Sequence, residues 1–139
     1  MSVDRTTLDA LKHAYHEWNR TLGGSAEVWL GLLADDVCFG SLANGAEAMK
    51  FTEERHSKEA VVDYFKGLEA EWEMKHYRIA DYIVDGDQVV ARGDCCFRHR
   101  KTGMELATPK ADFLKFKDGK VVEFFEFYDT ARAFEAAQG

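Results

Sequence analysis

The sequence predicts an α+β fold, with helices in the first half of the chain and an antiparallel sheet in the second. Apolar residues recur at helical spacing as far as Trp72, and from Glu73 onward β-rich runs alternate with short turn sequences. Segregated helices and strands favour α+β over βαβ winding. The 139 residues fit one domain, residues 1–139. Ten Phe, five Tyr and three Trp are many for this length and suggest that the aromatic core encloses a bound ligand.

Two helices are predicted near the N-terminus. The longer one carries a single apolar stripe of residues at steps of three and four. Gly23 and Gly24 end it as a C-terminal cap does, and Ser25 can cap a second, short helix that ends near Ala34. The first stripe consists of Leu8, Leu11, Tyr15, Trp18 and Leu22, and the second of Val28, Trp29, Leu32 and Leu33.

A short strand is predicted at Val37–Phe39, after the acidic pair Asp35 and Asp36. Residues 40–56 show no clear period, and we expect a loop or flap there. Ser57 then opens a third helix. The buried stripe of this helix is formed by Val61, Tyr64, Phe65, Leu68 and Trp72.

Three turn sequences divide the second half of the chain into four antiparallel strands. Asp129 or Thr130 can cap a last short helix through Phe134, after which we expect the chain to fray. The turns lie at residues 85–87, 101–103 and 117–120, and the strands at residues 73–84, 88–100, 104–116 and 120–128.

The last strand is aromatic on both faces, so we expect both faces to be covered. The three N-terminal helices can cover only one of them. We therefore expect the back of the sheet to be covered by a second copy of the chain, in a homodimer. Alternation places Val122, Phe124, Glu126 and Tyr128 on one face and Val121, Glu123, Phe125 and Phe127 on the other.

The charge and the cysteine content of the chain limit the classes of ligand and partner that it can bind. With 25 acidic and 18 basic residues and no long basic run, the chain lacks the positive field that nucleic acids and anionic membranes attract. No uncharged stretch approaches the roughly 20 residues that span a bilayer, and no signal peptide is evident, so we expect a cytoplasmic protein. Cys38, Cys95 and Cys96 form neither a disulfide framework nor a metal knuckle. Without a glycine-rich phosphate loop or a nucleophile elbow, no cofactor or metal is expected.

The order of elements resembles the nuclear transport factor 2-like (NTF2-like) superfamily, which includes ketosteroid isomerase-like proteins and SnoaL-like polyketide cyclases. The resemblance lies in Leu32–Phe39, in Asp112–Val122 and in the ending Glu126–Thr130. It implies a curved, cone-shaped antiparallel or mixed sheet whose concave face is covered by the three N-terminal helices. In that superfamily the apolar interior of the cone hosts catalysis or simple binding, so the fold does not fix the function.

The resemblance also suggests site residues. In ketosteroid isomerases a carboxylate a few residues after the Ala-Asp-Asp stretch is the general base, and Ser41 stands there in this chain. A serine hydroxyl cannot abstract a proton at neutral pH unless another group activates it, so steroid isomerisation by that route is not expected. Asp112 corresponds to the protonated carboxyl of the oxyanion site. Tyr15, or Ala14 in another alignment, corresponds to its tyrosine.

Asp112, Glu126 and His99 are the candidate proton carriers. If Asp112 points into the cone, burial raises its pKa; the alternative is an outward side chain paired with Lys110 or Arg98. Glu126 shares a strand face with aromatic residues and would complete a proton-transfer pair, the alternative being an ion pair with Lys110. Strand parity places His99 near the cone mouth, where it either shuttles a proton or is hydrogen-bonded in place.

Further residues are expected around a bound ligand. Glu53, Arg55 and His56 in the loop could reach over it, although ordinary loop polarity explains them equally well. The expected wall of the site consists of Trp18, Ser41, Tyr64, Phe65, Phe97, Phe124 and Tyr128.

Two functions follow as hypotheses. The first is a cofactor-free isomerase, cyclase or lyase that acts on a small hydrophobic carbonyl compound by proton transfer, with Asp112 as acid or base and Tyr15 as oxyanion donor. The second is a non-catalytic module that binds a small molecule or a protein. In the second case the inward carboxylates should be salt-bridged rather than free in a cavity.

Overall fold

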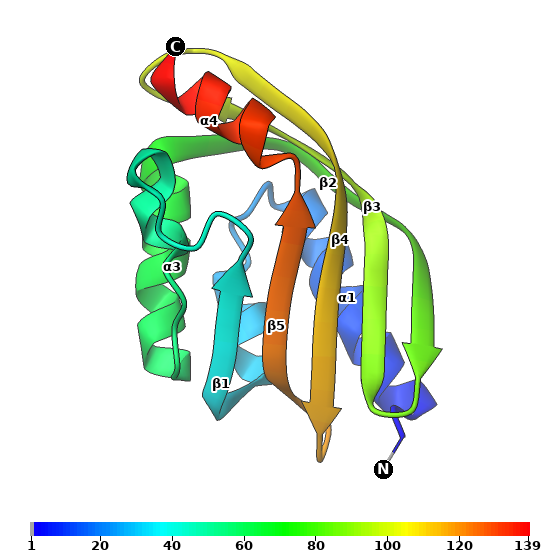
Figure 1. Cartoon of the computed structure of the whole chain (residues 1–139). Helices are drawn as coiled ribbons and strands as arrows, with labels where there is room; N and C mark the ends of the chain where they lie inside the picture. The colour runs from blue at the N-terminus through cyan, green and yellow to red at the C-terminus, as the bar shows by residue number, and fades with distance from the viewer. Residues whose placement is uncertain (1) are drawn as a thin grey trace.

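The computed structural model describes residues 2–139 and has the predicted α+β architecture. Figure 1 follows the chain from α1 at the N-terminus to α4 at the C-terminus. The helices are α1 (Arg5–Arg20), α2 (Ala26–Leu32), the short 3-10 helix η1 (Glu47–Thr52), α3 (Lys58–Glu71) and α4 (Thr130–Gln138). The strands are β1 (Leu33–Ser41), β2 (Trp72–Asp85), β3 (Gln88–His99), β4 (Glu105–Lys117) and β5 (Lys120–Tyr128).

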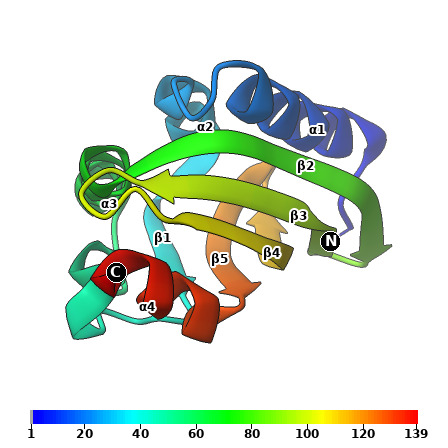
Figure 2. The same ribbon diagram turned by 90° about the horizontal axis from the view of Figure 1, so that it is seen from above.

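One five-stranded sheet, ordered β1-β5-β4-β3-β2, forms the second layer of the molecule. Strands β2 to β5 pair antiparallel, and β1 pairs with β5 in parallel. Figure 2 shows α1 and α2 on one side of the curved sheet, with α3 at its end. The four predicted antiparallel strands agree with β2–β5 to within one residue at each boundary.

Side-chain caps start α1, α3 and α4, and those of α3 and α4 are the predicted ones, whereas the predicted cap Ser25 makes no side-chain capping bond at α2. Asp4 accepts a hydrogen bond from the Thr7 N–H at 2.8 Å at the start of α1. Ser57 caps α3 and Asp129 caps α4 in the same way.

The prediction that Gly23 ends the first helix as a C-terminal cap is confirmed, but the prediction that Leu22 belongs to the buried stripe is wrong. The helix ends at Arg20, and Leu22 is 54% exposed rather than part of the buried stripe. Leu22 has a φ of 51° and Gly23 a φ of 83°, which turns the chain out of the helix. The Gly23 N–H bonds to the carbonyl of Trp18 at 2.9 Å, as in a wrapped helix C-terminus.

The last helix is longer than predicted. Instead of fraying after Phe134, α4 continues to Gln138. It does so because Ala133 and Ala136 are buried, 0% and 2% exposed, where the helix packs across the end of the sheet. Thr102, in the β3–β4 turn, donates to the carbonyl of Ala136 at 2.6 Å.

A bulge in β5 breaks the predicted alternation. Val121 and Glu123 pair with consecutive residues of β4, so Val122 between them has no partner of its own. Val121 and Phe124 consequently both face the core, 0% and 6% exposed. The prediction that Val122 shares a face with Phe124 while Val121 lies opposite is wrong. From Phe124 to Tyr128 the expected alternation holds, because no further bulge intervenes.

Strands β2 and β3 approach each other very closely at one point of their pairing. A Cβ atom on Gly93 of β3 would overlap the carbonyl oxygen of Arg78 on β2, so only glycine fits there. The pairing of these strands shifts nearby, between Ile79 and Asp81. The close approach and the irregularity together let the sheet curl around α1.

Residues 42–56, which we call the covering segment, contain η1 and replace the predicted structureless loop. Arg55 and Phe39 exchange two backbone hydrogen bonds of 2.8 Å, which fastens this segment to β1. On its other side, a Cβ on Gly67 would collide with Phe51, so glycine lets α3 pack closely on η1. The covering segment is therefore held from both sides.

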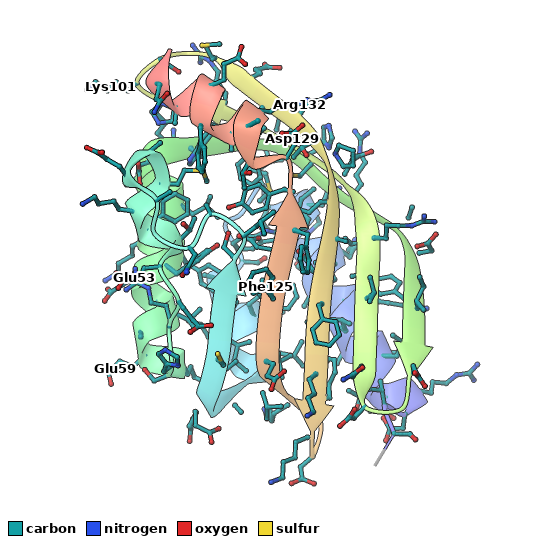
Figure 3. All side chains as sticks on the ribbon, viewed as in Figure 1. Glu53, Glu59, Lys101, Phe125, Asp129 and Arg132 are labelled. Atoms are coloured by element: carbon teal, nitrogen blue, oxygen red, sulfur yellow. The ribbon has the colours of Figure 1, made fainter. Side chains whose placement is uncertain are left out.

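The outer face of the sheet carries apolar side chains that no helix covers among residues 2–139. Figure 3 shows Phe125 on this face of β5, turned away from α1. Phe127 on the same face is 47% exposed, and the two rings lie 4.9 Å apart. The predicted homodimer through this face stays a prediction.

None of the described helices is long and apolar enough to cross a membrane. The expected cytoplasmic location also stays a prediction.

We expect light scattering to show a dimer at micromolar concentration, because pairing two outer faces removes the Phe125–Phe127 patch from water. Phe127→Asp should give a monomer. Ile83→Asp is the matched control, since Ile83 is 56% exposed far from this patch, at the β2–β3 hairpin. A monomeric wild-type protein would contradict the predicted dimer.

Candidate functional site

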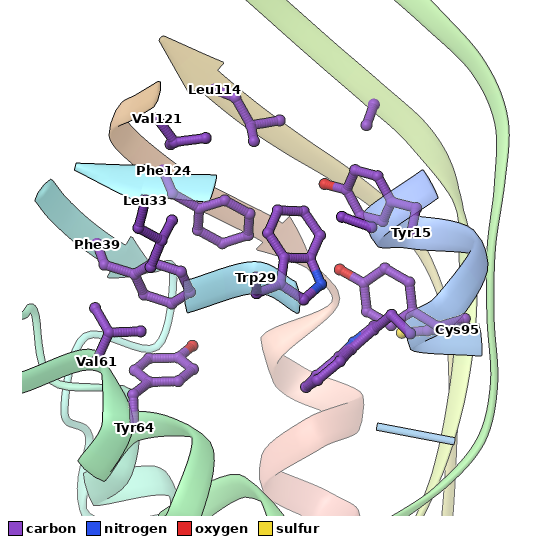
Figure 4. Close-up of a cluster of buried hydrophobic side chains, with 14 of the residues drawn as sticks. Tyr15, Trp29, Leu33, Phe39, Val61, Tyr64, Cys95, Leu114, Val121 and Phe124 are labelled. Carbon is purple, nitrogen blue, oxygen red and sulfur yellow. The ribbon is translucent and has the colours of Figure 1, made fainter. Parts of the chain in front are cut away.

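A cavity of about 70 Å³ lies between the inner face of the sheet and the helices. Figure 4 shows Tyr15, Trp29, Tyr64 and Phe124 gathered in this interior from α1, α2, α3 and β5. Since one water molecule needs about 10–15 Å³ by this kind of measure, the cavity has room for several waters or a small organic molecule. Most residues of the predicted wall line it: Trp18, Tyr64, Phe65, Phe97, Phe124 and Tyr128.

Three charged side chains enter this apolar cavity from β4 and β5. Lys110 and Asp112 are two residues apart on β4 and therefore share a face. Asp112 pairs across the strands with Glu126, and Lys110 with Tyr128. The residue exposures are 0% for Asp112 and 5% for Lys110, so these two charged groups are buried.

Lys110 lies between the two carboxylates. Its Nζ donates a 2.6 Å hydrogen bond to Oε2 of Glu126. The same atom is 2.9 Å from Oδ1 of Asp112, but off the axis of a hydrogen bond, so that contact is an ion pair only. The ammonium also lies 5.2 Å from the ring centre of Tyr77 and 5.4 Å from that of Tyr128. Among residues 2–139, Glu126 is thus the only oxygen acceptor of the ammonium, and its other two protons have none.

Two tyrosine hydroxyls converge on the second oxygen of Asp112. Tyr15 Oη donates to Oδ2 at 2.7 Å and Tyr77 Oη donates to it at 2.6 Å. Burial, and then the charge of Asp112, raises the pKa of both tyrosines well above its ordinary value. Both hydroxyls therefore remain protonated donors. Of the two alignments in the family resemblance, the geometry favours Tyr15, because Ala14 does not reach the cavity.

Glu126 has its own set of donors. Tyr64 Oη donates to Oε1 while Lys110 occupies Oε2. The Glu126 side chain is 17% exposed, which makes it the more accessible of the two carboxylates. Beside it, Tyr128 Oη and Ser41 Oγ share a 2.6 Å hydrogen bond. Ser41 is 1% exposed and lies behind Tyr128 rather than in the cavity wall.

Burial and charge oppose each other at the centre of the cluster. Burial raises the pKa of Asp112, and the charge of Glu126 adds to this, although Lys110 and the tyrosine hydroxyls act against it. Burial alone would lower the pKa of Lys110, but Asp112 and Glu126 outweigh it and raise that pKa. Lys110 is therefore a persistent cation rather than a neutral nucleophile.

The structure places His99 away from this cluster. His99 is on the inner face and 6% exposed, as strand parity predicts, but it does not line the cavity. Its Nδ1 accepts the N–H of Thr102 at 3.3 Å, and its ring meets the edge of Trp72. These contacts match the alternative in which His99 is only hydrogen-bonded in place.

Sequence reasoning missed two members of the cluster. Lys110 was available from strand parity, because a residue two positions from an inward Asp112 must also point inward. Tyr77 gave no such signal, since β2 shifts register on both sides of it, after Met74 and after Ile79. The alternative of an outward Asp112 side chain is wrong, because Asp112 lines the cavity, although it does pair with Lys110. For Glu126 the two alternatives are not exclusive: it lines the cavity and pairs with Lys110.

A second hollow of about 360 Å³ opens on the surface beside the cavity, between the C-terminal ends of α1 and α3. Its rim carries the charged side chains of Glu69, Glu73, Lys75 and Arg100. The same apolar side chains line both hollows and form the partition between them: Trp18, Phe65, Leu68, Trp72 and Phe97. Movement of this partition would join the cavity to the surface hollow.

The chain is similar to known proteins both in sequence and in fold. Residues 11–124 match the family described as SnoaL-like domain. A comparison with curated proteins found no match.

Solved structures match over nearly the whole chain. An NTF2-like protein of unknown function from Burkholderia pseudomallei is 16% identical, with a TM-score of 0.82 over 98% of this chain and 100% of that one. TerC, co-crystallised with polyporic acid, is 15% identical, with a TM-score of 0.79 over 96% and 98%. A putative SnoaL-like polyketide cyclase from Mesorhizobium loti is 20% identical, with a TM-score of 0.73 over 92% and 100%. At these identities the likeness concerns the fold.

From the buried ion cluster we predict a large loss of stability when its cation, Lys110, is removed. Lys110→Met leaves two carboxylates buried without their counter-charge, and we expect the free energy of unfolding to fall by about 3–5 kcal/mol. Urea unfolding measures this. Lys117→Met, at the exposed end of the same strand, should change the free energy of unfolding by no more than about 0.5 kcal/mol. A Lys110→Met protein as stable as wild type would show that the ion cluster does not form.

All five tyrosines have a raised pKa in the folded chain, which predicts its alkaline behaviour. Burial raises the pKa of Tyr82 and of Tyr128 to about 12, against an ordinary 10.0. Above pH 10 the unfolded chain releases phenolic protons that the folded chain keeps, so stability falls as pH rises. We expect phenolate absorbance to appear only with unfolding or near pH 12. A phenolate step near pH 10 in folded protein would contradict this.

Proposed function

The chain belongs to the SnoaL-like domain family, and from this premise we propose that it binds a small hydrophobic carbonyl compound in the cavity and moves a proton on it, without a cofactor. One observation carries the proposal: Lys110, Asp112 and Glu126 meet inside an otherwise apolar, aromatic cavity. Burying three charges costs several kcal/mol per ion before pairing offsets it. Charges retained in such a place are typical of functional sites.

Lys110 is the donor for the oxygen of the ligand. One of its ammonium protons is donated to Glu126, and a proton without an oxygen acceptor is available to a carbonyl or enolate oxygen. In a cavity without bulk water, such a donor stabilises negative charge that develops on that oxygen. The raised pKa of Lys110 keeps the donor protonated at neutral pH.

Glu126 is the proton carrier. It lines the cavity and is less buried than Asp112, and a carboxylate next to an enolisable C–H is a suitable general base. Asp112 is a positioning residue, because its Oδ2 accepts from the hydroxyls of Tyr15 and Tyr77 and its Oδ1 is held in an ion pair with Lys110 without a hydrogen bond. Tyr15 therefore acts on the oxygen of the ligand through Asp112 and Lys110, unless the ligand displaces Asp112 from its hydroxyl.

The names of two structural neighbours support the ligand class. TerC was crystallised with polyporic acid, and the Mesorhizobium loti protein is named a putative polyketide cyclase. The size of the cavity favours a ligand smaller than the usual occupant of a 300–1,000 Å³ pocket unless the aromatic partition opens.

A second candidate, binding without catalysis, has one observation in its favour. Both inward carboxylates are already paired with Lys110, as expected for a non-catalytic module. In that case the cluster would only orient a polar atom of the ligand. The two candidates differ in one measurable property, the transfer of a proton to or from carbon.

Deuterium exchange at the carbon next to a carbonyl separates the candidates. We expect wild-type protein in deuterated buffer to exchange the C–H protons of at least one of indanone, tetralone and acetophenone, followed by NMR. Glu126→Gln should slow this exchange by about 100-fold or more, the usual contribution of a general base. Saturation-transfer NMR on the same samples measures binding independently.

Glu105→Gln is the matched control, because Glu105 lies exposed at the start of β4 outside the cavity. Its exchange rate should equal that of wild type. Binding of these ketones without exchange would rule out catalysis and support the binding function. A protein that neither binds nor exchanges any of them would falsify the assigned ligand class.

A further inference from the structure

A second group of chemically reactive side chains lies outside the cavity, at the edge of the sheet. Cys38 is on the edge strand β1, and Glu54 and His56 are at the end of the covering segment. The backbone bridge between Phe39 and Arg55 holds these two stretches together. The bridge places residues 38, 54 and 56 beside one another, so their proximity follows from the fold.

The three side chains offer sulfur, oxygen and nitrogen ligand atoms within 4.8 Å of one another. Cys38 Sγ lies 3.5 Å from Oε1 of Glu54, and His56 Nε2 lies 3.4 Å from Oε2. Zinc bonds of about 2.3 Å to sulfur and about 2.0–2.2 Å to nitrogen or oxygen put tetrahedral ligand atoms about 3.3–3.6 Å apart. Each observed carboxylate contact has that spacing, one on each oxygen of Glu54, and a small rotation of the exposed Glu54 carboxylate would bring one oxygen to both partners.

A further acidic side chain lies next to Cys38 on the neighbouring strand. Glu123 of β5 is the in-register partner of Cys38, and residues in register point to the same face of a sheet. Burial, followed by the carboxylates of Glu54 and Glu123, raises the pKa of the Cys38 thiol. Two acidic groups beside a thiol and an imidazole make a local field that favours a cation.

The site is open to solvent. The side chains of His56 and Glu54 are 72% and 45% exposed, so an ion can reach them without unfolding. Cys38 is partly buried, which ties the sulfur to the rigid strand.

We propose that Cys38, Glu54 and His56, with Glu123 as the fourth ligand, bind a divalent transition-metal ion of the zinc type. Mixed sulfur, nitrogen and oxygen ligands select zinc-type ions over magnesium or calcium, which prefer oxygen alone. The ion would join the covering segment to β1 and so hold Met49 and Phe51, which line the cavity from this segment. The proposal is independent of the proposed catalysis.

Cobalt(II) tests the site directly, because a cobalt–thiolate bond gives a near-ultraviolet charge-transfer band. We expect this band when Co²⁺ is added to the full-length wild-type protein, and its displacement by Zn²⁺. Cys38→Ser should abolish the band, and His56→Ala should weaken Co²⁺ affinity by at least about tenfold. Circular dichroism would confirm that both variants are folded.

Cys96→Ser is the matched control. Cys96 also has a glutamate neighbour, with its Sγ 3.7 Å from Oε1 of Glu105, but it belongs to no group of three ligands among residues 2–139. Its band should equal that of wild type. A band that survives Cys38→Ser and is lost in Cys96→Ser, or no band in wild type at millimolar Co²⁺, would overturn the proposal.

A second readout is thermal. Zn²⁺ should raise the melting temperature of wild type, since an ion that binds only the folded chain stabilises it by mass action. The Cys38→Ser and His56→Ala variants should show no such rise. An equal rise in all variants would place the ion elsewhere and contradict the site.

Discussion

The placement of one lysine constrains much of this structure. The ammonium of Lys110 lies in an apolar interior, where an unpaired charge costs several kcal/mol. Only a register that brings Glu126 opposite Asp112 supplies two counter-charges at once. A slip of one residue would turn the β5 carboxylate to the outer face and leave the lysine partly unpaired. The pairing of β4 with β5 is therefore fixed by charge as well as by apolar burial.

Elements could be predicted from the sequence wherever a local rule decides them. The hairpin turns are an example: Asp118 and Gly119 both have a positive φ, which this short Asp-Gly turn requires. Val121 and Val122 mark the limit of such rules, because alternation assumes one residue per step and a bulge inserts an extra one. The length of α4 also escaped prediction, since it depends on tertiary packing of Ala133 and Ala136.

The candidate site was predictable in part for the same reason. Parity along β4 and β5 is undisturbed from residue 110 to 114 and from 124 to 128, so the inward direction of Asp112 and Glu126 could be inferred. Lysine is a surface residue by default, and that expectation hid Lys110 despite its parity with Asp112. His99 shows the converse: the correct face of a strand does not ensure a place in the cavity.

Phe39 links the two sites physically. Its ring lines the cavity and stacks on Phe124, with centroids 4.3 Å apart. Its backbone exchanges both hydrogen bonds of the bridge to Arg55, the residue between Glu54 and His56. A force that tightens the bridge therefore acts on a residue in the cavity wall. Two sites coupled in this way must influence each other equally in both directions, because coupling between binding free energies is reciprocal. A ligand that pushes Phe39 outward would loosen the ion, and an ion that tightens the bridge would favour ligands that fit the closed wall.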